Sequence, residues 1–386
     1  MVDDWVAPQV LSPSAKAIAV EVLVHGAQSR ARLADRMGLS AASLTRLVKP
    51  LLAAGVLVEE EAVRDSQRGR SSLPLDVVEN SRRFVGIKLT TDTAYAVVTD
   101  LRARILDRVV APLPPLDVPH VTATVLALVD ELRTRGSGAV DALGVTVGGS
   151  VVGGDLVADS PYLHWHDVPF RSLVQDALSL PVHLDNDVVG LTKAQHWFGS
   201  GTGYADFALL TVGAGIGYGL VLDDVMVPVP LGLFAHYPID PGGPLCQVGH
   251  RGCLTSYATT RSITSAASVA HDRPIGYAEV MDLARNGDPV ASRLLAEAAH
   301  ALGKAAAGVA ATTGVPRIIL SGEGVHLAEV ARSALDAGLD EYHPPGVAQA
   351  EPVIQPMDFF EWARGAAVVA IQEEWPPPVT APPEEE

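Results

Sequence analysis

A chain of 386 residues can bury the cores of two or three domains, and 48% of its residues are hydrophobic. Its longest apolar stretch, residues 208–222, is interrupted by glycines and is too short to span a bilayer. Residues 1–10 lack the basic start and apolar core of a secretory signal, and two cysteines are too few for a disulfide framework. We therefore expect a cytoplasmic protein with no membrane partner.

The net charge of −17 is unevenly distributed along the chain. Residues 1–83 contain 11 Lys and Arg against 10 Asp and Glu, whereas residues 84–386 contain 17 against 35. Within the first part, residues 16–49 contain six basic and two acidic residues. Because a nucleic acid is bound by a basic surface, the N-terminal part suits this purpose better than the acidic remainder.

The N-terminal part predicts three successive helices, at residues 14–25, 29–37 and 41–55, from apolar residues at helical spacing. Ser29 and Ser40 are suited to cap the second and third helices, which are separated by a turn at residues 38–40. Two short helices joined by such a turn, the second with a polar first half, are typical of a helix-turn-helix, in which that half enters the major groove of DNA. The candidate DNA contacts in the third helix are Ser43, Thr45, Arg46 and Lys49.

After the third helix, residues 56–77 predict two strands joined by a basic loop, as in the wing of a winged helix-turn-helix. Arg68 and Arg70 in this loop are suited to phosphates or to a narrow minor groove. We expect residues 1–80 to form a winged helix-turn-helix domain whose partner is a double-stranded DNA operator. The alternative is a three-helix docking domain whose arginines are merely solvated.

From residue 84 onward, strand patterns alternate with helical patterns, which indicates an α/β body. The first half predicts a hairpin at residues 85–110, a helix near 122–135 and a strand at 142–149. A second set follows, with a strand at 181–187, a helix at 188–198, a pair of strands at 207–224, and a strand with a glycine-rich turn at 315–324. The end of the chain, residues 379–386, is rich in Pro and Glu and predicts a disordered tail.

Four stretches of this body carry a family signature. They are LDND at residues 184–187, LTVGAGIGYGLVL at 210–222, HYPIDPGGPLCQVGHRGCL at 236–254 and ILSGEG at 319–324. With the order of segments, they resemble the ROK family (repressors, open reading frames and kinases) over nearly the full chain, including the winged helix of its regulators. The resemblance implies an α/β, actin-like (ribonuclease H-like) two-lobed body of ATPase fold at residues 81–378, with lobes at 84–197 plus the C-terminal helix and at 198–363. It also implies a homodimer or a dimer of dimers.

Sugar kinases of this family hold the magnesium nucleotide partly with an Asp-x-Gly-Gly-Thr hairpin, which the resemblance aligns with residues 88–92. Here Lys88 puts a cation in place of the acid, and Thr90 and Thr91 put β-branched side chains where glycines allow close approach of phosphate. Glycines remain within residues 213–217 and at 322 and 324. We therefore expect that the chain is not an enzyme and does not turn over ATP and Mg²⁺.

The family's general base corresponds to Asp187 and its sugar-contacting asparagine to Asn186, and both residue types are present. A carboxylate beside an amide can hold vicinal hydroxyls without any catalysis, but the alternative is that the two residues cap the helix that starts at residue 188. Three other sugar contacts differ, because Tyr162, Leu233 and Thr255 replace an Asn and two Glu. The effector is therefore expected to differ from a plain hexose or to be absent.

The family's zinc loop uses one His and three Cys, of which His236, Cys246 and Cys253 are present. Val248 occupies the position of the middle cysteine, and His250 is the nearest substitute for the fourth ligand of a tetrahedral structural Zn²⁺. The alternative is a loop held by packing alone, with the two cysteines as small buried hydrophobic residues.

These patterns predict a sequence-specific DNA-binding transcriptional regulator, a repressor, whose kinase-like body senses a small carbohydrate-related ligand without phosphorylating it. The predicted ligand contacts are Asn186, Asp187 and His236. One alternative is an ATP-dependent sugar kinase of the glucokinase type that carries an extra domain. Another is a body without a small ligand that signals through a protein partner.

Overall fold

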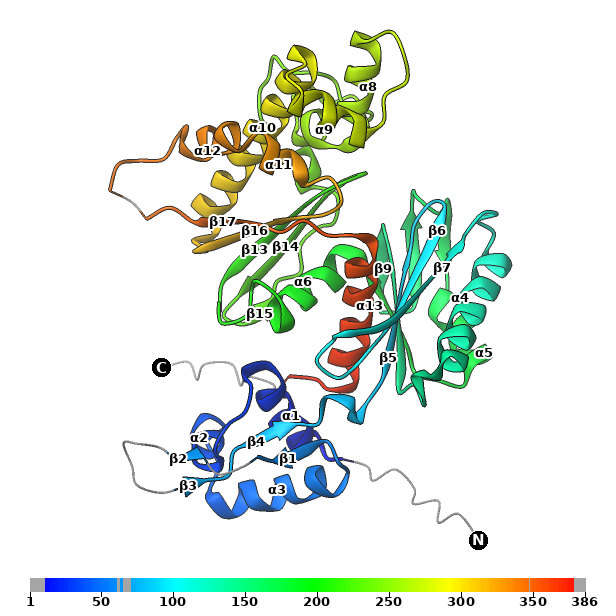
Figure 1. Cartoon of the computed structure of the whole chain (residues 1–386), viewed down its shortest axis with the longest axis vertical. Coiled ribbons are helices and arrows are strands. Elements are labelled where there is room, and N and C mark those ends of the chain that lie inside the picture. The colour runs from blue at the N-terminus through cyan, green and yellow to red at the C-terminus, as the bar shows by residue number, and fades with distance from the viewer. Residues whose placement is uncertain (1–10, 61–62, 65–70, 347, 378–386) are drawn as a thin grey trace. The chain divides into compact units, whose positions relative to one another are not determined.

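The computed structural model describes residues 11–60, 63–64, 71–346 and 348–377. The chain divides into two compact units, one made of Met1–Gly190 with Trp362–Glu386 and the other of Leu191–Glu361 (Figure 1). Arg68, Arg70 and the predicted tail at residues 379–386 lie outside the described residues. Among the helices of the described ranges, none combines the length and the hydropathy that a membrane crossing needs.

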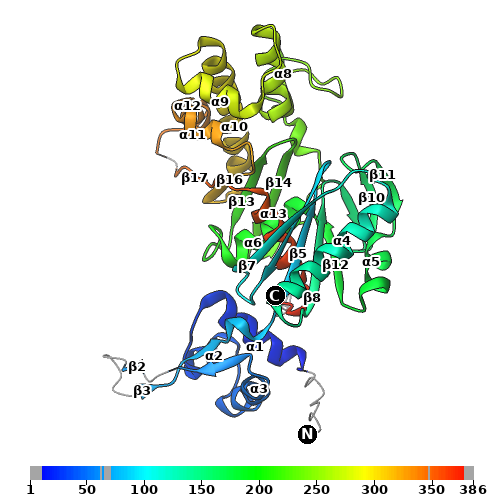
Figure 2. The same cartoon turned by 45° about the vertical axis from the view of Figure 1, so that its right-hand side comes forward.

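The N-terminal module of the first unit consists of three helices and two short antiparallel strand pairs. The helices are α1 (Pro13–His25), α2 (Arg30–Arg36) and α3 (Ala41–Ala53); β1 (Leu57–Glu59) pairs with β4 (Leu75–Val77), and β2 (Val63–Arg64) pairs with β3 (Ser71–Ser72). The side chains of Ser29 and Ser40 accept hydrogen bonds from the first turns of α2 and α3, so both predicted caps are confirmed. Figure 2 shows β2 and β3 extending away from the three helices.

A small apolar core holds this module together. Ile18 and Val22 of α1, Leu33 of α2, and Leu44 and Leu51 of α3 are buried. These residues recur at helical spacing, so each helix turns an apolar face inward and leaves a polar face to solvent. The polar face of α3 is therefore available at the surface of the module.

A five-stranded mixed sheet forms the centre of the rest of the first unit. Its strands in spatial order are β12 (Val182–Asn186), β8 (Ala142–Val147), β5 (Phe84–Leu89), β6 (Thr93–Thr99) and β7 (Ile105–Pro112). β12, β8 and β5 are parallel, whereas β5, β6 and β7 are antiparallel neighbours, so the predicted hairpin at residues 85–110 is a three-stranded meander. A smaller antiparallel sheet contains β9 (Ser150–Val152), β10 (Leu156–Ser160) and β11 (Trp165–Val168).

Helices cover both faces of the larger sheet, which explains why every residue of β5 and β8 is buried. α4 (Val118–Leu132) and α5 (Phe170–Leu178) pack on one face, and α13 (Phe359–Glu374) packs on the other (Figure 1). Gly86 and Gly144 are required on the α13 side, because a Cβ at these positions would lie 2.1 and 1.8 Å from carbonyl oxygens of α13. Near their carboxyl ends, the parallel strands β5 and β12 bring Lys88 and Asn186 to the same edge of the sheet.

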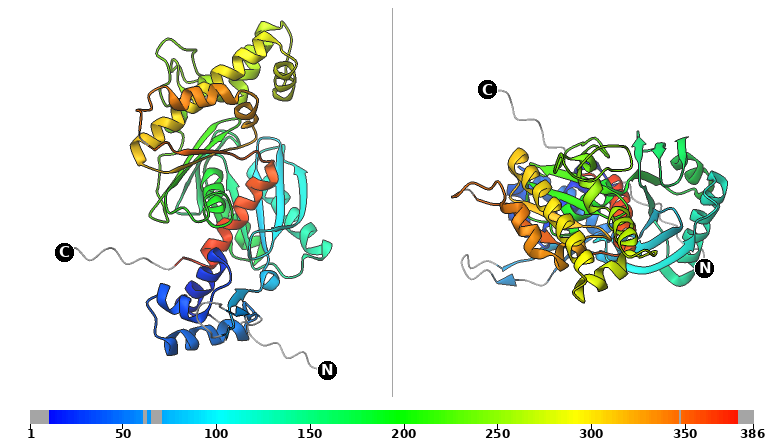
Figure 3. Two further views of the ribbon diagram at one scale, coloured as in Figure 1. Left: turned by 60° about the vertical axis from the view of Figure 1, so that its left-hand side comes forward. Right: turned by 90° about the horizontal axis from the view of Figure 1, so that it is seen from above.

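The second unit contains another five-stranded sheet in which some neighbouring strands are parallel and others antiparallel. Its strands in spatial order are β15 (Val225–Met226), β14 (Ile216–Leu222), β13 (Phe207–Val212), β16 (Arg317–Ser321) and β17 (Glu351–Ile354), of which β13, β16 and β17 are parallel. The helices are α7 (Leu254–Ala258), α8 (Thr260–Ala270), α9 (Tyr277–Arg285), α10 (Pro289–Thr313), α11 (His326–Val330) and α12 (Arg332–Asp340). α10 and α12 lie side by side (Figure 3), and a Cβ at Gly303 or Gly338 would lie 2.2 Å from a carbonyl oxygen of the other helix. These two glycines therefore allow the close contact of the two helices.

Helix α6 (Asp187–Phe198) follows β12, and short helical turns complete the chain: η1 (Glu79–Ser81), η2 (Arg133–Ser137) and η3 (Phe234–His236). The predicted alternation of strands and helices from residue 84 onward is confirmed, and it makes an α/β body. The segments that concern function are α3, the loops after β5, β12, β13 and β16, and the long connection from η3 to α7.

Candidate functional site

Helix α3 turns polar and basic side chains away from its buried leucines. Thr45, Arg46 and Lys49 are exposed, and Ser43 is partly exposed. The Thr45 hydroxyl donates a hydrogen bond to the carbonyl of Ala41 (2.8 Å), which holds this side chain along the helix. The four predicted DNA contacts of α3 are therefore accessible from outside the module.

The cations of α3 differ in their surroundings from a cation of the preceding helix. Arg36 of α2 is neutralised within the module, because its Nε lies 2.7 Å from a carboxylate oxygen of Glu21. Over the residues that the structure describes, neither Arg46 nor Lys49 has an acidic partner. Exposed cations without an internal partner are suited to DNA phosphates.

Asn186 ends β12 and is 5% exposed. Its Oδ1 accepts a hydrogen bond from the amide of Val188 (2.8 Å), and its Nδ2 donates one to the carbonyl of Gly149 (2.8 Å). Asn186 therefore caps the start of the helix that follows it, as the second of the two alternatives predicts. The same side chain holds the loop after β8 next to the start of α6.

Asp187 follows directly and uses its two oxygens on different partners. Oδ1 accepts a hydrogen bond from the amide of Val188 (2.9 Å), and Oδ2 accepts one from Nζ of Lys88. Lys88 is 6% exposed, and its Nζ also lies 5.6 Å from the centre of the Trp362 ring. Lys88 and Asp187 thus form a nearly buried ion pair, and a carboxylate in such a pair is a hydrogen-bond acceptor rather than a free base.

The residues that replace the other predicted sugar contacts lie in three different surroundings. Tyr162 lies against the loop after β8, since a Cβ at Gly148 would be 2.7 Å from its ring. The side chain of Leu233 is 70% exposed, and the Thr255 hydroxyl donates to the carbonyl of Ala235 (2.6 Å). This last bond fixes η3 against α7.

Two glycine turns meet at the ends of the parallel strands β13 and β16. One contains residues 213–215 and the other residues 322–324, and the amide of Gly324 donates to the carbonyl of Val212 (2.8 Å). The side chain of Glu323 reaches the first turn, where its Oε1 accepts a hydrogen bond from the amide of Ala214 (3.0 Å). We call residues 213–215 and 322–324 the paired glycine turns.

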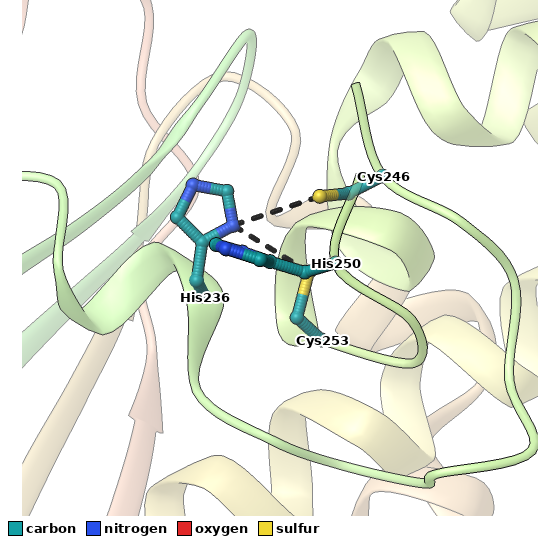
Figure 4. A group of neighbouring side chains, drawn as sticks. All are labelled: His236, Cys246, His250 and Cys253. Atoms are coloured by element: carbon teal, nitrogen blue, oxygen red, sulfur yellow. Dashed lines mark hydrogen bonds between the residues drawn. The ribbon is translucent and has the colours of Figure 1, made fainter. Parts of the chain in front are cut away.

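Four potential metal ligands converge in the connection between η3 and α7 (Figure 4). They are His236, Cys246, His250 and Cys253, whose ligand atoms all lie within 4.8 Å of one another. Nδ1 of His236 lies 3.8 Å from Sγ of Cys246 and 3.6 Å from Sγ of Cys253, and its ring centre lies 4.5 Å from that of His250. The amide of Cys246 donates to the carbonyl of His250 (2.8 Å), and this tight turn brings the second histidine to the cluster.

The chemistry of the cluster suits zinc. Two sulfur and two nitrogen donors make a complete tetrahedral set, and neither cysteine forms a disulfide. Burial opposes ionisation of the Cys246 thiol, but hydrogen bonds from backbone amides, beginning with that of Val248, outweigh it and lower the pKa. Burial raises the pKa of Cys253, whereas burial and the neighbouring His250 lower the pKa of His236, which favours the neutral imidazole that binds metals.

The sequence model of the ROK family matches residues 84–372. The chain belongs to the ROK family. Among curated relatives of this ROK protein, the xylose repressor of Bacillus spizizenii is 24% identical over 280 residues, which cover 71% of this chain and 72% of the repressor. The glucokinase of Thermotoga maritima is 28% identical over 234 residues, which cover 55% of this chain and 74% of the kinase.

A solved structure of a ROK family transcriptional regulator, a homologue of the Escherichia coli MLC protein, has the same fold. It aligns with a TM-score of 0.79 and 21% identity over 94% of this chain and 97% of that chain. The predicted fold class is confirmed, since N-terminal helices precede an α/β body with two actin-like lobes. The cluster of two histidines and two cysteines is typical of the zinc-binding motif of ROK proteins.

Two features of this ROK protein were not found by sequence reasoning. Lys88 was noticed as a cation in place of an acid, but its partner Asp187 lies 99 residues away in the sequence. Glu323 lies in the ILSGEG stretch at residues 319–324, yet no pattern there indicates that its carboxylate reaches Ala214. For Lys88 the informative signal was a cation at the position where the sugar kinases of the family have an acid.

Proposed function

We propose that this ROK protein is a sequence-specific DNA-binding transcriptional regulator, a repressor, whose body binds a small carbohydrate-related ligand without phosphorylating it. The observation that carries the proposal is the ion pair between Lys88 and Asp187. A carboxylate held by a lysine can accept hydrogen bonds from a sugar, but it is poorly suited to take a proton from a hydroxyl during phosphoryl transfer. The similarity to a xylose repressor over 71% of the chain supports the same function.

The N-terminal module, residues 1–80, is the proposed DNA-binding domain. Arg46 and Lys49 would contact phosphates or base edges, with Ser43 and Thr45 beside them and Arg68 and Arg70 reaching the minor groove or the backbone. A homodimer or a dimer of dimers would place two copies of α3 on a roughly palindromic operator. Within the described part of the module, Arg46 and Lys49 have no acidic partner, which leaves both available for phosphates.

The body, residues 81–378, is the proposed sensor. Of the predicted ligand contacts, Asp187 is best suited to a direct bond, because Oδ2 is shared with Lys88 and a carboxylate oxygen can accept more than one donor. Asn186 would shape the surroundings of Asp187 through its bonds to Gly149 and Val188. His236 belongs to the second unit, and its contact with the ligand stays a prediction from the resemblance. Ligand binding would alter the geometry of the dimer and thereby the spacing of the two α3 helices.

We also propose one structural Zn²⁺ per chain, held by His236, Cys246, His250 and Cys253. The ion would cross-link the connection between η3 and α7, and it would supply folding free energy to this segment rather than any catalytic chemistry. The four ligands leave no coordination position for a substrate.

The proposed function is tested by capture of genomic fragments on the purified full-length protein, followed by mobility-shift assays on the enriched fragments. A defined set of palindromic sites, with affinity that changes when a sugar or sugar derivative is added, is the expected result. The matched variant is Arg46→Ala with Lys49→Ala, which should lose the enrichment. Absence of any enriched fragment for the native protein contradicts the proposal.

A second candidate function is an ATP-dependent sugar kinase, favoured by the similarity to the Thermotoga maritima glucokinase and by the presence of Asp187. This candidate predicts phosphoryl transfer to a sugar that is abolished in Asp187→Asn. A coupled assay for ADP release over a panel of hexoses and pentoses separates the two functions. Robust turnover of any sugar refutes the regulator without kinase activity.

A further inference from the structure

The paired glycine turns are held tightly against each other. The carboxyl ends of β13 and β16 are in register, with Thr211 opposite Ser321, so the two turns emerge side by side. Gly322 has a φ of +96°, and a Cβ there would lie 2.4 Å from the carbonyl oxygen of Val212. The position of the second turn is thus set by backbone contacts with Val212 at the end of β13, directly before the first turn.

These contacts deliver the Glu323 carboxylate directly onto the first turn. The amide of Ala214 donates to Oε1 of Glu323 (3.0 Å), and a Cβ at Gly213 would lie 1.9 Å from the same oxygen. On its other side, the carbonyl of Gly213 accepts a hydrogen bond from the amide of Thr260 (2.9 Å). Because Gly213 has no side chain, an anion can approach the first turn closely. The anion that does so here is the carboxylate of Glu323.

The surroundings of the Glu323 carboxylate determine how its charge acts on a second anion. Among the residues described by the structure, no Lys, Arg or His forms an ion pair with Glu323. The pKa of nearby Tyr277 is raised, chiefly by its burial and in addition by the negative charge of Glu323. A second anion that approached the Ala214 amide would meet both the volume and the uncompensated charge of Glu323.

We propose that Glu323 is a built-in anion that occupies a phosphate-binding position on the first glycine turn and excludes ligands with a phosphoryl group from it. A glycine turn that presents a backbone amide is a common cradle for phosphate oxygens, and the Glu323 carboxylate takes the place of such an oxygen at the Ala214 amide. Glu323 is therefore a specificity-determining residue of the second unit. This inference does not depend on DNA binding or on the identity of the effector.

The test measures binding of inorganic phosphate and, separately, of ATP to the full-length protein by calorimetry and by thermal shift. Glu323→Ala removes both charge and volume, so we expect it to bind one of these probes about tenfold more tightly than the native protein, or more. Glu323→Gln keeps the volume and an oxygen acceptor but loses the charge, so its binding should fall between the two. The matched control is Glu329→Ala, which removes an exposed carboxylate of α11 that is paired with His326 (2.8 Å).

The outcomes separate the sources of the phosphoryl group. A gain for inorganic phosphate identifies a free anion site, and a gain for ATP alone identifies a nucleotide site; both support the proposal. Equal binding by the native protein and Glu323→Ala refutes it, because the carboxylate then blocks nothing. No gain in either Glu323→Ala or Glu323→Gln, with melting temperatures close to the native value, also refutes it, because the turn is then not an anion site. If Glu323→Ala does not fold, Glu323→Gln alone decides in the same way.

Discussion

Replacement of Lys88 by Met should destabilise the first unit by about 3 kcal/mol. The Met side chain has nearly the same length, so the main effect is that Asp187 loses its counter-ion in a nearly buried position. Removal of one partner of a buried ion pair costs about 3–5 kcal/mol, and the lower end applies here. The reason is that Asp187 is 16% exposed and keeps its hydrogen bond from the amide of Val188.

The assay is urea unfolding followed by circular dichroism and tryptophan fluorescence for four proteins: native, Lys88→Met, Asp187→Asn and the double variant. The double-mutant cycle isolates the interaction between the two side chains from their separate effects. We expect a coupling of about 2 kcal/mol, because neutral Asn at position 187 no longer needs the ammonium. The control is Arg135→Met, which breaks an exposed pair with Glu131 and should cost less than about 1 kcal/mol.

The result that refutes this reasoning is a Lys88→Met protein as stable as the Arg135→Met control. Asp187 would then be stabilised without the lysine. The ion pair would no longer be a reason why Asp187 is poorly suited to act as a general base. A coupling near zero in the cycle would lead to the same conclusion. In either case the role of Lys88 would have to be sought in the binding of the ligand, measured by comparing the native protein with Lys88→Met.

Three further predictions concern the DNA interface, the metal and pH. Arg46→Ala with Lys49→Ala should weaken operator binding about tenfold or more and reduce the salt slope of log K by about 1 per lost phosphate contact, measured by anisotropy at several salt concentrations. His250→Ala should lower the zinc content from one ion per chain and lower the melting temperature, measured by native mass spectrometry and calorimetry. The hydrogen bond from His183 lowers the pKa of Glu374 below its ordinary value. The stability that this bond contributes is present above the pKa of the unfolded chain and is lost as pH falls through the lower pKa of the folded state, so the native protein should lose more stability than Glu374→Gln on acidification.

The DNA and zinc predictions each have a matched control, and the pH prediction has a result that would contradict it. Arg36→Ala removes a cation of the N-terminal module that is already paired with Glu21, so it should change DNA binding less than the α3 variant does. Val248→Ala alters an exposed side chain of the zinc loop and should leave the zinc content unchanged. A Glu374→Gln protein whose acid unfolding parallels that of the native chain would exclude the His183 bond as a source of stability.

The sequence was sufficient for features that depend on neighbours in the chain. Ser29 and Ser40 cap helices because the bonds that they make reach only three residues ahead. The resemblance to the ROK family also predicted the members of the metal cluster, of which Cys246, His250 and Cys253 lie within one short loop and His236 precedes it by ten residues. The alternation of strands and helices indicated the α/β body for the same reason, because burial on a strand or a helix leaves a local period.

Only the tertiary structure decided which charges meet across the sheets. Lys88 and Asp187 are 99 residues apart. They pair because β5 and β12 run in the same direction, so that their carboxyl ends lie at the same end of one sheet. Glu323 and Ala214 are 109 residues apart, and they meet because β13 and β16 are in register in the other sheet. Strand order and register are set by the packing of the whole unit. No local pattern could therefore reveal that Asp187 pairs with an ammonium group and Glu323 with a backbone amide.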